Sequence, residues 1–209
     1  MFLKKLLVVF TLLIMTSFSV HAETRPVING TYTNVPGVQF NFDGKQVEII
    51  EFFSFYCGHC FEFEKSIPVI KGNFPKKIKW RQIPIFWGDG SPKPGEAYFL
   101  AKDAGKGEEM KKAIFKALFI DGKDIGKVEV LEELGVKIGL GFDFSHKLRT
   151  GAKAGEVGES IIMTKTYGID ETPALIIAGN IKTSPHMLEH SMNNLRDNAI
   201  TILKSLLNK

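Results

Sequence analysis

The pattern of apolar and polar positions predicts a sheet whose central strand is buried on both faces. Residues 47–55, VEIIEFFSF, form a nearly unbroken run of apolar, β-branched and aromatic side chains, which is typical of such a strand. A second run at residues 77–86, KIKWRQIPIF, predicts another strand, and residues 38–42, VQFNF, alternate as an edge strand does. Residues 173–179, PALIIAG, predict a late strand, and NIKTS after them carries a weaker strand signal.

Helical periodicity begins directly after the first buried run and dominates the middle of the chain. From Cys60 onward, apolar residues recur at spacings of three and four, and we expect Pro68 to kink or break this helix. A loop rich in proline and glycine covers residues 87–96, and residues 96–166 then contain separate helical pieces that stop at glycines. Residues 187–209 are predicted to form one long amphipathic helix.

The order of these segments predicts an α/β domain that is split by an all-helical insertion. We expect the α/β domain to comprise residues 23–87 and 166–209, with the insertion at residues 88–165. A folded domain tolerates such an insertion because the inserted segment is joined to it only at the two ends of one loop. Residues 23–37 are rich in turn formers and are expected to fray or to lie along the surface.

The N-terminus has the order of a secretory signal peptide. Two lysines precede an apolar run at residues 6–20, and the small residue Ala22 ends the segment. The apolar run is about 15 residues long, whereas a membrane-spanning helix needs about 20. We therefore expect residues 1–22 to be cleaved and the mature protein to reach an oxidising compartment, where disulfides persist.

Composition and charge then limit the kind of protein that remains. About 187 residues follow the signal peptide, enough for one domain with an insertion. Removal of the two N-terminal lysines lowers the formal net charge from +4 to +2, and the other lysines are scattered along the chain. Nucleic-acid binding is therefore not expected. No later segment is long and apolar enough to span a bilayer, so we expect a soluble mature protein.

The chain has only two cysteines, Cys57 and Cys60, and they lie in the segment EFFSFYCGHCFEFE. A structural disulfide across two residues restricts the unfolded chain very little, and would stabilise the fold weakly. A metal site needs three or four ligands. His59 lies between the two cysteines, but the chain has no second cysteine pair to complete such a site. The other histidines of the mature chain show no paired spacing and are expected at the surface: His146, His186 and His190. A redox-active pair is favoured, with the structural disulfide and the metal site as alternatives.

The predicted strand and helix around the motif give the two cysteines unequal roles. Cys57 is expected at the helix N-terminus, where backbone N–H groups without partners stabilise the reactive thiolate. Lowering a thiol pKa from ~8.5 to about 5.5 requires on the order of 4 kcal/mol, and a helix terminus contributes about 0.3–2 kcal/mol. We therefore expect His59 to contribute as an imidazolium or N–H donor. Cys60, one turn further along, is expected to be shielded and to act as the resolving cysteine.

The segment FFSFYCGHCFEFE resembles the active-site segment of the DsbA family of exported thiol-disulfide oxidases. Over essentially the whole mature chain, the later segments are similar to the family in order: helical insertion, GIDETPALIIAG and terminal helix. The resemblance implies a thioredoxin-like domain, in which helices flank a central mixed sheet, interrupted by an all-helical insertion domain. It also implies a redox-active Cys57–Cys60 disulfide and no further cofactor.

The resemblance implies roles for residues around the cysteine pair. A cis peptide bond is expected at Thr172–Pro173, facing the pair, with the backbone of Thr172 free to hold a substrate chain. The best-known members have Pro-His between the cysteines, whereas this chain has Gly58-His59, the dipeptide of eukaryotic protein disulfide isomerases. The pair should still be oxidising, with a redox potential that depends on Gly58.

Glu51 interrupts the buried strand six positions before Cys57. An unpaired buried carboxylate is unfavourable, so Glu51 should have a partner or be partly neutral. Thioredoxin-like proteins carry an acid here, which implies a proton acceptor for Cys60; the alternative is a salt-bridged or edge-exposed glutamate. Where the family can have a lysine on the next strand, this chain has Gln82. Two cations are close to Gln82 on the same predicted strand, Lys79 and Arg81.

Together these features predict a periplasmic thiol:disulfide oxidoreductase that donates its disulfide to reduced or unfolded exported proteins through a mixed disulfide at Cys57. The resemblance implies an apolar substrate groove beside Cys57 and an inner-membrane, quinone-linked re-oxidant of the DsbB type. A disulfide isomerase or reductase of the same fold is one alternative. Such isomerases usually carry an N-terminal dimerisation domain, and only about 25 mature residues precede the first strand here, so we expect a monomer. A non-catalytic thioredoxin-like binding module is the other alternative.

Overall fold

A five-stranded mixed sheet forms the centre of the computed structural model, which describes residues 27–88 and 90–207. The strands are β1 (Thr33–Asn34), β2 (Val47–Ser54), β3 (Ile78–Ile85), β4 (Ala174–Ile177) and β5 (Ile181–Thr183). Their order across the sheet is β1-β5-β4-β2-β3, in which only β2 and β3 are parallel. The predicted mixed sheet is therefore confirmed. The predicted signal peptide lies outside the described residues.

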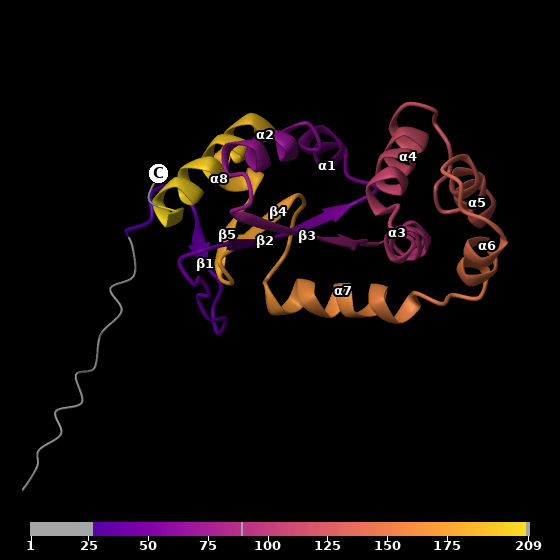
Figure 1. Cartoon of the computed structure of the whole chain (residues 1–209), viewed down its shortest axis with the longest axis horizontal. Helices are drawn as coiled ribbons and strands as arrows, with labels where there is room; N and C mark the ends of the chain where they lie inside the picture. Colours follow the sequence, from indigo (N-terminus) through magenta and orange to yellow (C-terminus); the bar gives the residue numbers. More distant parts are fainter. Residues whose placement is uncertain (1–26, 89, 208–209) are drawn as a thin grey trace, which may run out of the picture.

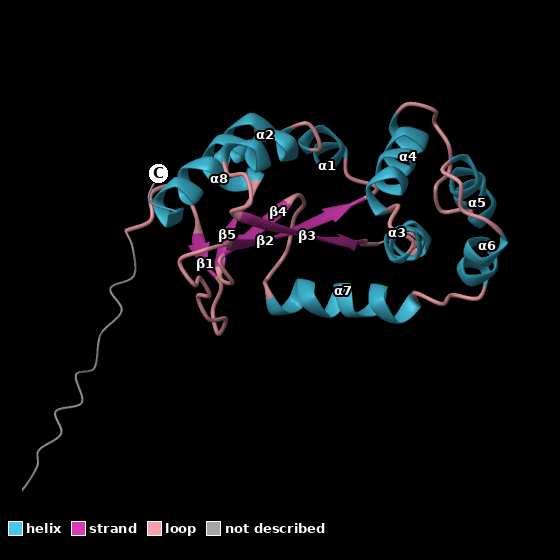
Figure 2. Cartoon of the chain, in the orientation of Figure 1, coloured by secondary structure: helices cyan, strands magenta, loops and turns pink. Residues whose placement is uncertain are grey.

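Helices cover both faces of this sheet and gather at one end of it. The α-helices of the described residues are α1 (Gly58–Phe63), α2 (Ser66–Asn73), α3 (Lys93–Asp103), α4 (Gly107–Phe119), α5 (Val128–Lys137), α6 (Phe142–Arg149), α7 (Ala154–Thr166) and α8 (Met192–Leu207). In Figure 1, α1, α2 and α8 lie on one side of the sheet and α7 on the other. Helices α3 to α6 lie beyond the ends of β2 and β3, as the cyan helices of Figure 2 also show. No helix of the described residues has the length and apolar character needed to cross a membrane.

The central strand β2 is buried on both faces, as its composition predicts. Every residue of β2 except Glu48 is buried. Ile49 packs into the core beneath α2 and α8, whereas Phe52 points to the opposite face and meets the ring of Tyr167 after α7, at 5.6 Å between centroids. Apolar packing on both faces therefore fixes the position of β2. The cysteine motif, which follows the end of β2, is positioned by this strand.

The helix after β2 is broken between Phe63 and Ser66, which confirms the expected effect of Pro68. Proline has no N–H to donate to the carbonyl of Glu64, four residues earlier, and its ring would clash with that carbonyl in a continuous helix. The chain therefore leaves α1 at Glu64, which is the C-cap residue, and starts again as α2. This break leaves Glu64 at the end of α1, one helical turn after Cys60.

The edge of the sheet differs from the prediction. Residues 38–42 form no strand, and the edge position beside β5 is taken by Thr33 and Asn34. The Asn41 N–H donates to the carbonyl of Ala178 at 2.8 Å, but no ladder follows. The chain turns at Gly37, whose φ is +74°, and this turn directs residues 38–42 past the β4–β5 connection. The alternation of VQFNF therefore reflects partial burial against that connection.

One helical boundary also differs. The C-terminal helix begins at Met192 rather than at residue 187, because Glu189 and His190 have φ values of 55° and 56° that a helix cannot contain. A separate 3₁₀ helix, Pro185–Leu188, precedes this break. The helical middle of the chain is confirmed, although its last helix, α7, packs against β3 and covers the sheet. The domain boundaries at residues 88 and 165 stay a prediction.

Candidate active site

Cys57 caps the N-terminus of α1 with its own sulfur. Its backbone is extended, with φ −100° and ψ 115°, and its Sγ accepts a hydrogen bond from the backbone N–H of Cys60 at 3.3 Å. The Cys57 N–H donates to the carbonyl of Ser54, the last residue of β2, at 3.1 Å. The strand, the turn and the helix thus place the sulfur at the helix N-terminus, where the sequence predicts it.

The loop before β4 brings Thr172 against this sulfur. In the thiol form, Cys57 Sγ donates to the carbonyl oxygen of Thr172 at 3.2 Å. The peptide bond between Thr172 and Pro173 is cis, as expected. Ala174, the next residue, pairs with Phe52 in the antiparallel β2–β4 register, so the sheet holds this loop beside the cysteines. The structure therefore brings both predicted loop residues to the pair.

The two thiols differ strongly in their proton affinity. Hydrogen bonding from the Cys60 thiol is the largest cause that lowers the pKa of Cys57 from 9.0 to about 6, although burial opposes the shift. Thr172 and the backbone N–H groups of Cys60 and His59 lower it further. Burial, and then donation of its S–H to Cys57, raise the pKa of Cys60 well above 9.0. The two cysteines are not joined in this structure, and the opposite pKa shifts favour a thiolate at Cys57 and a thiol at Cys60.

His59 reaches Cys57 through its backbone. Its side chain is exposed, and the contribution that lowers the pKa of Cys57 comes from its N–H group. The sequence argument assigns the missing stabilisation to the His59 ring, whereas the structure shows the Cys60 thiol as the largest source. A catalytic role of the His59 ring stays a prediction.

Aromatic side chains flank Cys57 on the side of the helical insertion. Phe61 of α1 stacks on Phe119 of α4, with 5.2 Å between ring centroids and 10° between ring planes. Tyr56 and Phe119 are both partly exposed, at 37% and 36%. We call these three residues the aromatic surface. A Cβ atom on Gly58 would meet the Phe119 ring at 3.9 Å, an ordinary contact, so the site has room for a larger residue there.

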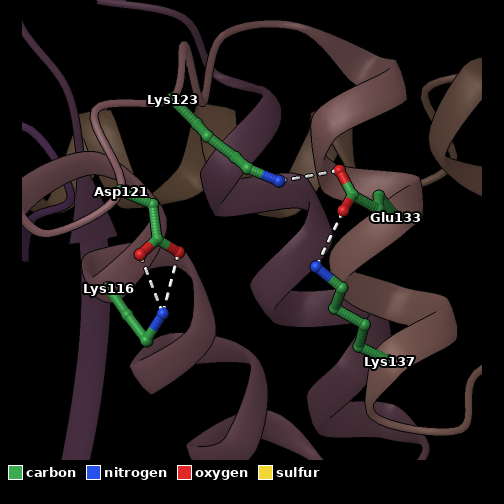
Figure 3. Close-up of polar contacts among 5 residues, drawn as sticks. All are labelled: Lys116, Asp121, Lys123, Glu133 and Lys137. Carbon is green, nitrogen blue, oxygen red and sulfur yellow. Dashed lines mark hydrogen bonds and ion pairs between the residues drawn. The ribbon is translucent and has the colours of Figure 1, made fainter.

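The segment that follows Phe119 is held by ion pairs on the surface. Figure 3 shows the ammonium of Lys116 on both carboxylate oxygens of Asp121, and the carboxylate of Glu133 between two lysines. These contacts measure 2.8 and 2.9 Å to Asp121, and 2.8 and 2.7 Å from Glu133 to Lys123 and Lys137. Hydrogen bonds from the two lysines lower the pKa of Glu133 to about 2. These ion pairs link the connection between α4 and α5 to the two helices, next to Phe119 of the aromatic surface.

Glu51 lies fully buried on the face of β2 toward α1 and α4. Its Oε2 accepts hydrogen bonds from the indole N–H of Trp80 at 2.9 Å and from the amide of Gln82 at 3.0 Å. Its Oε1 has no hydrogen-bond partner among the described residues. The ammonium of Lys111 lies 3.6 Å from Oε2, so Glu51 is paired and is not edge-exposed. Gln82 stands opposite Glu51 in the parallel register, as the sequence suggests.

The two strand cations near Gln82 point away from Glu51. Lys79 pairs with Glu48 at 3.0 Å, and Arg81 contacts the sulfur of Met163 at 3.2 Å. Arg81 is one position and Lys79 three positions before Gln82, so both side chains face the side of the strand opposite to Gln82, because side chains alternate along a strand. Neither therefore serves as a partner for Glu51.

Sequence reasoning missed two charged residues of this buried region, Lys111 and Glu64. Lys111 has no exposed side-chain surface, and its ammonium lies 2.5 Å from Oε1 of Glu64. Each residue carries a signal in the sequence. Lys111 shares a helix face with Ile114 and Phe115, where a lysine interrupts the apolar stripe, and Glu64 follows Cys60 by one helical turn.

Comparisons with known proteins agree with this geometry. A family model described as the DSBA-like thioredoxin domain matches residues 48–196. The chain is 27% identical over 144 residues to the thiol:disulfide interchange protein DsbA of Burkholderia cepacia, covering 67% of this chain and 66% of that relative. It is 26% identical over 170 residues to the DsbA of Haemophilus influenzae, covering 79% and 81%. The chain thus spans about two thirds or more of the length of these relatives.

Solved structures share the fold. The oxidoreductase DsbA from Xylella fastidiosa superposes with a TM-score of 0.70 at 19% identity, covering 88% of this chain and 96% of the other. The DsbA of Pseudomonas aeruginosa superposes with a TM-score of 0.69 at 16% identity, covering 86% and 95%. At these identities the likeness shows the fold, which confirms a thioredoxin-like domain combined with additional helices.

Proposed function

The chain belongs to the DSBA-like thioredoxin family of thiol:disulfide oxidoreductases, and from this premise we propose that it oxidises reduced exported proteins with a Cys57–Cys60 disulfide. The opposite pKa shifts of the two thiols carry this proposal. Interactions that stabilise the Cys57 thiolate stabilise the reduced form of the pair. A stabilised reduced form makes the corresponding disulfide a stronger oxidant.

The reaction proceeds through a mixed disulfide at Cys57. A substrate thiolate attacks Cys57 Sγ, the Cys57–Cys60 bond breaks, and Cys60 leaves with the electron pair and takes up a proton. The second substrate thiolate then attacks the substrate sulfur of the mixed disulfide, and Cys57 leaves as a thiolate. Two electrons pass from the substrate dithiol to the enzyme. Cys57 is suited to both steps because it is half-exposed, whereas Cys60 is buried.

Glu51 is proposed as the proton acceptor for Cys60 in the return direction. The buried carboxylate has a free Oε1, and its other oxygen is held by Trp80 and Gln82. Cys60 needs such a base because its raised pKa keeps it protonated at neutral pH.

The substrate chain is proposed to bind across Thr172 and the aromatic surface. When Cys57 is in a mixed disulfide it no longer donates to Thr172, so that carbonyl can accept a hydrogen bond from a substrate backbone N–H. The partly exposed rings of Tyr56 and Phe119 offer apolar contact to an unfolded segment next to its cysteine. Such a surface favours unfolded chains of varied sequence over one folded partner.

The proposed place of action is the periplasm, where the reduced pair must be re-oxidised. An export signal at residues 1–22 favours the periplasm as the place of action. Continuous turnover needs an electron acceptor, and we propose an inner-membrane, quinone-linked re-oxidant of the DsbB type. The cysteine pair itself carries the two electrons, so the proposed reaction requires neither a metal nor a bound cofactor. A monomer suffices for this chemistry.

Equilibration of the pair with glutathione, combined with oxidation of a reduced two-cysteine peptide, tests this function. We expect a reduction potential closer to the about −120 mV of DsbA than to the about −270 mV of thioredoxin. We also expect Cys57→Ser to abolish peptide oxidation. A potential near that of thioredoxin, or efficient rearrangement of a scrambled substrate, would favour a reductase or an isomerase. Unchanged peptide oxidation by Cys57→Ser would favour a binding module.

A further inference from the structure

Three charged side chains from three elements meet in the apolar interior near the cysteines. The ammonium of Lys111 lies 3.6 Å from the Glu51 carboxylate and 2.5 Å from that of Glu64. Glu51 comes from β2, Glu64 caps the end of α1, and Lys111 comes from α4. The Lys111 ammonium also lies 4.3 Å from the centre of the Phe53 ring, an arrangement that favours a cation.

Lys111 is the cation that balances these two carboxylates. Within residues 27–88 and 90–207, it is the only cation whose nitrogen lies within 4.0 Å of the Glu51 carboxylate. The remaining partners of Glu51 are the neutral donors Trp80 and Gln82. Burial disfavours the charged form of Lys111, but the two carboxylates outweigh it and raise the pKa of the lysine. Lys111 therefore stays charged and faces the carboxyl groups of both Glu51 and Glu64.

The charge cluster and Cys60 are connected through α1 and through Phe53. Glu64 follows Cys60 by four residues, so the two side chains share one face of the turn that ends α1. Phe53, on which Lys111 rests, belongs to the same buried apolar cluster as Cys60. Because Cys60, Glu51 and Lys111 are fully buried, charge that develops on Cys60 is only weakly screened from the cluster.

We propose that Lys111, a residue of α4, is a positioning residue for the redox pair: it holds the carboxylates of Glu51 and Glu64 beside Cys60 and offsets their charge. The offset keeps Cys60 a competent leaving group when a thiolate attacks Cys57. This inference rests on the proposed oxidase function. It makes α4, which carries Phe119 at one end, a part of the redox site as well as of its surface.

The consequence for the reaction follows from the sign of the charges. When glutathione thiolate attacks Cys57, the Cys57–Cys60 bond breaks, a glutathione–Cys57 bond forms, and Cys60 leaves as an anion that then takes a proton. Nearby negative charge disfavours this anion and nearby positive charge favours it. Removal of Lys111 should therefore slow the step, and removal of the Glu64 charge should accelerate it. If the cluster were only structural, removal of Lys111 and removal of the Glu64 charge would not change the rate in opposite directions.

Stopped-flow reduction of the oxidised protein by glutathione at pH 8 tests the proposal. We expect Lys111→Met to slow reduction about tenfold, and Glu64→Gln to accelerate it severalfold. Lys112→Met is the matched control, because Lys112 is the exposed neighbour on the same helix and its removal changes the net charge equally. The control should react at the parent rate.

The pH profile separates an electrostatic role from a loss of packing. With rates corrected for the glutathione thiolate fraction, the Lys111→Met defect should shrink as the pH falls from 8 to 5, because burial raises the pKa of Glu64 and a proton then neutralises its charge. The other titratable groups that face the cluster are Glu108, which is exposed on α4, and Tyr98 of α3. Burial raises the pKa of Tyr98, so it stays neutral throughout this range.

The outcomes distinguish this inference from the proposed function. A parent protein that glutathione does not reduce would overturn the function. A parent that reacts normally, with Lys111→Met either unimpaired or equally slow at every pH, would overturn the role of Lys111 alone. If Lys111→Met does not fold, as judged by circular dichroism, Glu64→Gln decides: an unchanged or slower rate contradicts the proposal.

Discussion

The sulfur of Cys57 and the carbonyl oxygen of Thr172 lie 3.2 Å apart, although 115 residues separate them in the sequence. The antiparallel pairing of β2 and β4 maintains this contact, because Ala174 stands opposite Phe52 just before the cysteine motif. All the helices from α1 to α7 lie between these two points of the chain. Cys57, which is proposed to form the mixed disulfide, and the backbone proposed to hold its substrate are thus neighbours through the sheet.

Replacement of the resolving cysteine should raise the pKa of Cys57. The Cys60 thiol is the largest contribution to the lowered pKa, so Cys60→Ala should move it from about 6 toward 9.0. Thiolate absorbance at 240 nm, followed from pH 4 to pH 10, measures this shift. His59→Ala keeps its backbone N–H and should shift the pKa less than Cys60→Ala does. A larger shift in His59→Ala would assign the main role to the imidazole.

The reduced protein should become more stable as the pH rises from about 6 to 9. The pKa of Cys57 is depressed in the folded state, so its contribution is complete above the ordinary thiol value of 9.0 and is lost as the pH falls through about 6. Urea unfolding of the reduced protein across this range measures the effect. The oxidised protein, which has no Cys57 thiolate, supplies the reference, and parallel pH profiles of the two forms would contradict the prediction.

Glu51→Gln should slow the attack of Cys60 on a mixed disulfide between Cys57 and glutathione. The glutamine keeps an oxygen that can accept from Trp80 and Gln82 but cannot take the Cys60 proton, so a decrease of about 10²-fold is expected for loss of a general base. Release of glutathione after rapid mixing measures the rate. Trp80→Phe removes one hydrogen bond and keeps the acid, and should have a smaller effect. Equal rates for Glu51→Gln and the parent at every pH would exclude the role.

Phe119→Ala should weaken substrate binding and leave the chemical step intact. Phe119 stacks on Phe61 and is 36% exposed beside the motif, so its ring contributes contact that is equal in the ground and transition states. KM for a reduced peptide should rise severalfold while kcat stays within about twofold, the signature of lost uniform binding. Ile162→Ala removes an exposed apolar residue of α7 and should change neither constant. A fall in kcat with unchanged KM would place Phe119 in the reaction itself.

Local sequence determined the elements that carry the cysteines. The apolar run before the motif specifies a strand buried on both faces, and Pro68 specifies where the following helix breaks. Cys57 becomes the N-cap of α1 because the chain must leave the strand and start the helix within three residues. These features depend on side-chain period and backbone sterics over a few residues, so they can be predicted from the sequence. The cis bond at Thr172–Pro173 was predictable through the family resemblance.

Only the tertiary structure decided which groups meet at the pair. The alternation of VQFNF suggested an edge strand, yet Thr33 and Asn34 took that edge because a turn at Gly37 redirected the chain. A buried Glu51 predicts a charged or hydrogen-bonding partner, and the nearest cations in the predicted sheet are on β3. In the structure its cationic partner is Lys111 of α4, which is 60 residues away in the sequence. Strand pairing and helix packing set such encounters, and they depend on how distant segments fill one volume. The sequence by itself therefore determined the reactive motif and its local frame, whereas the packing of α4 against β2 decided the charges that surround it.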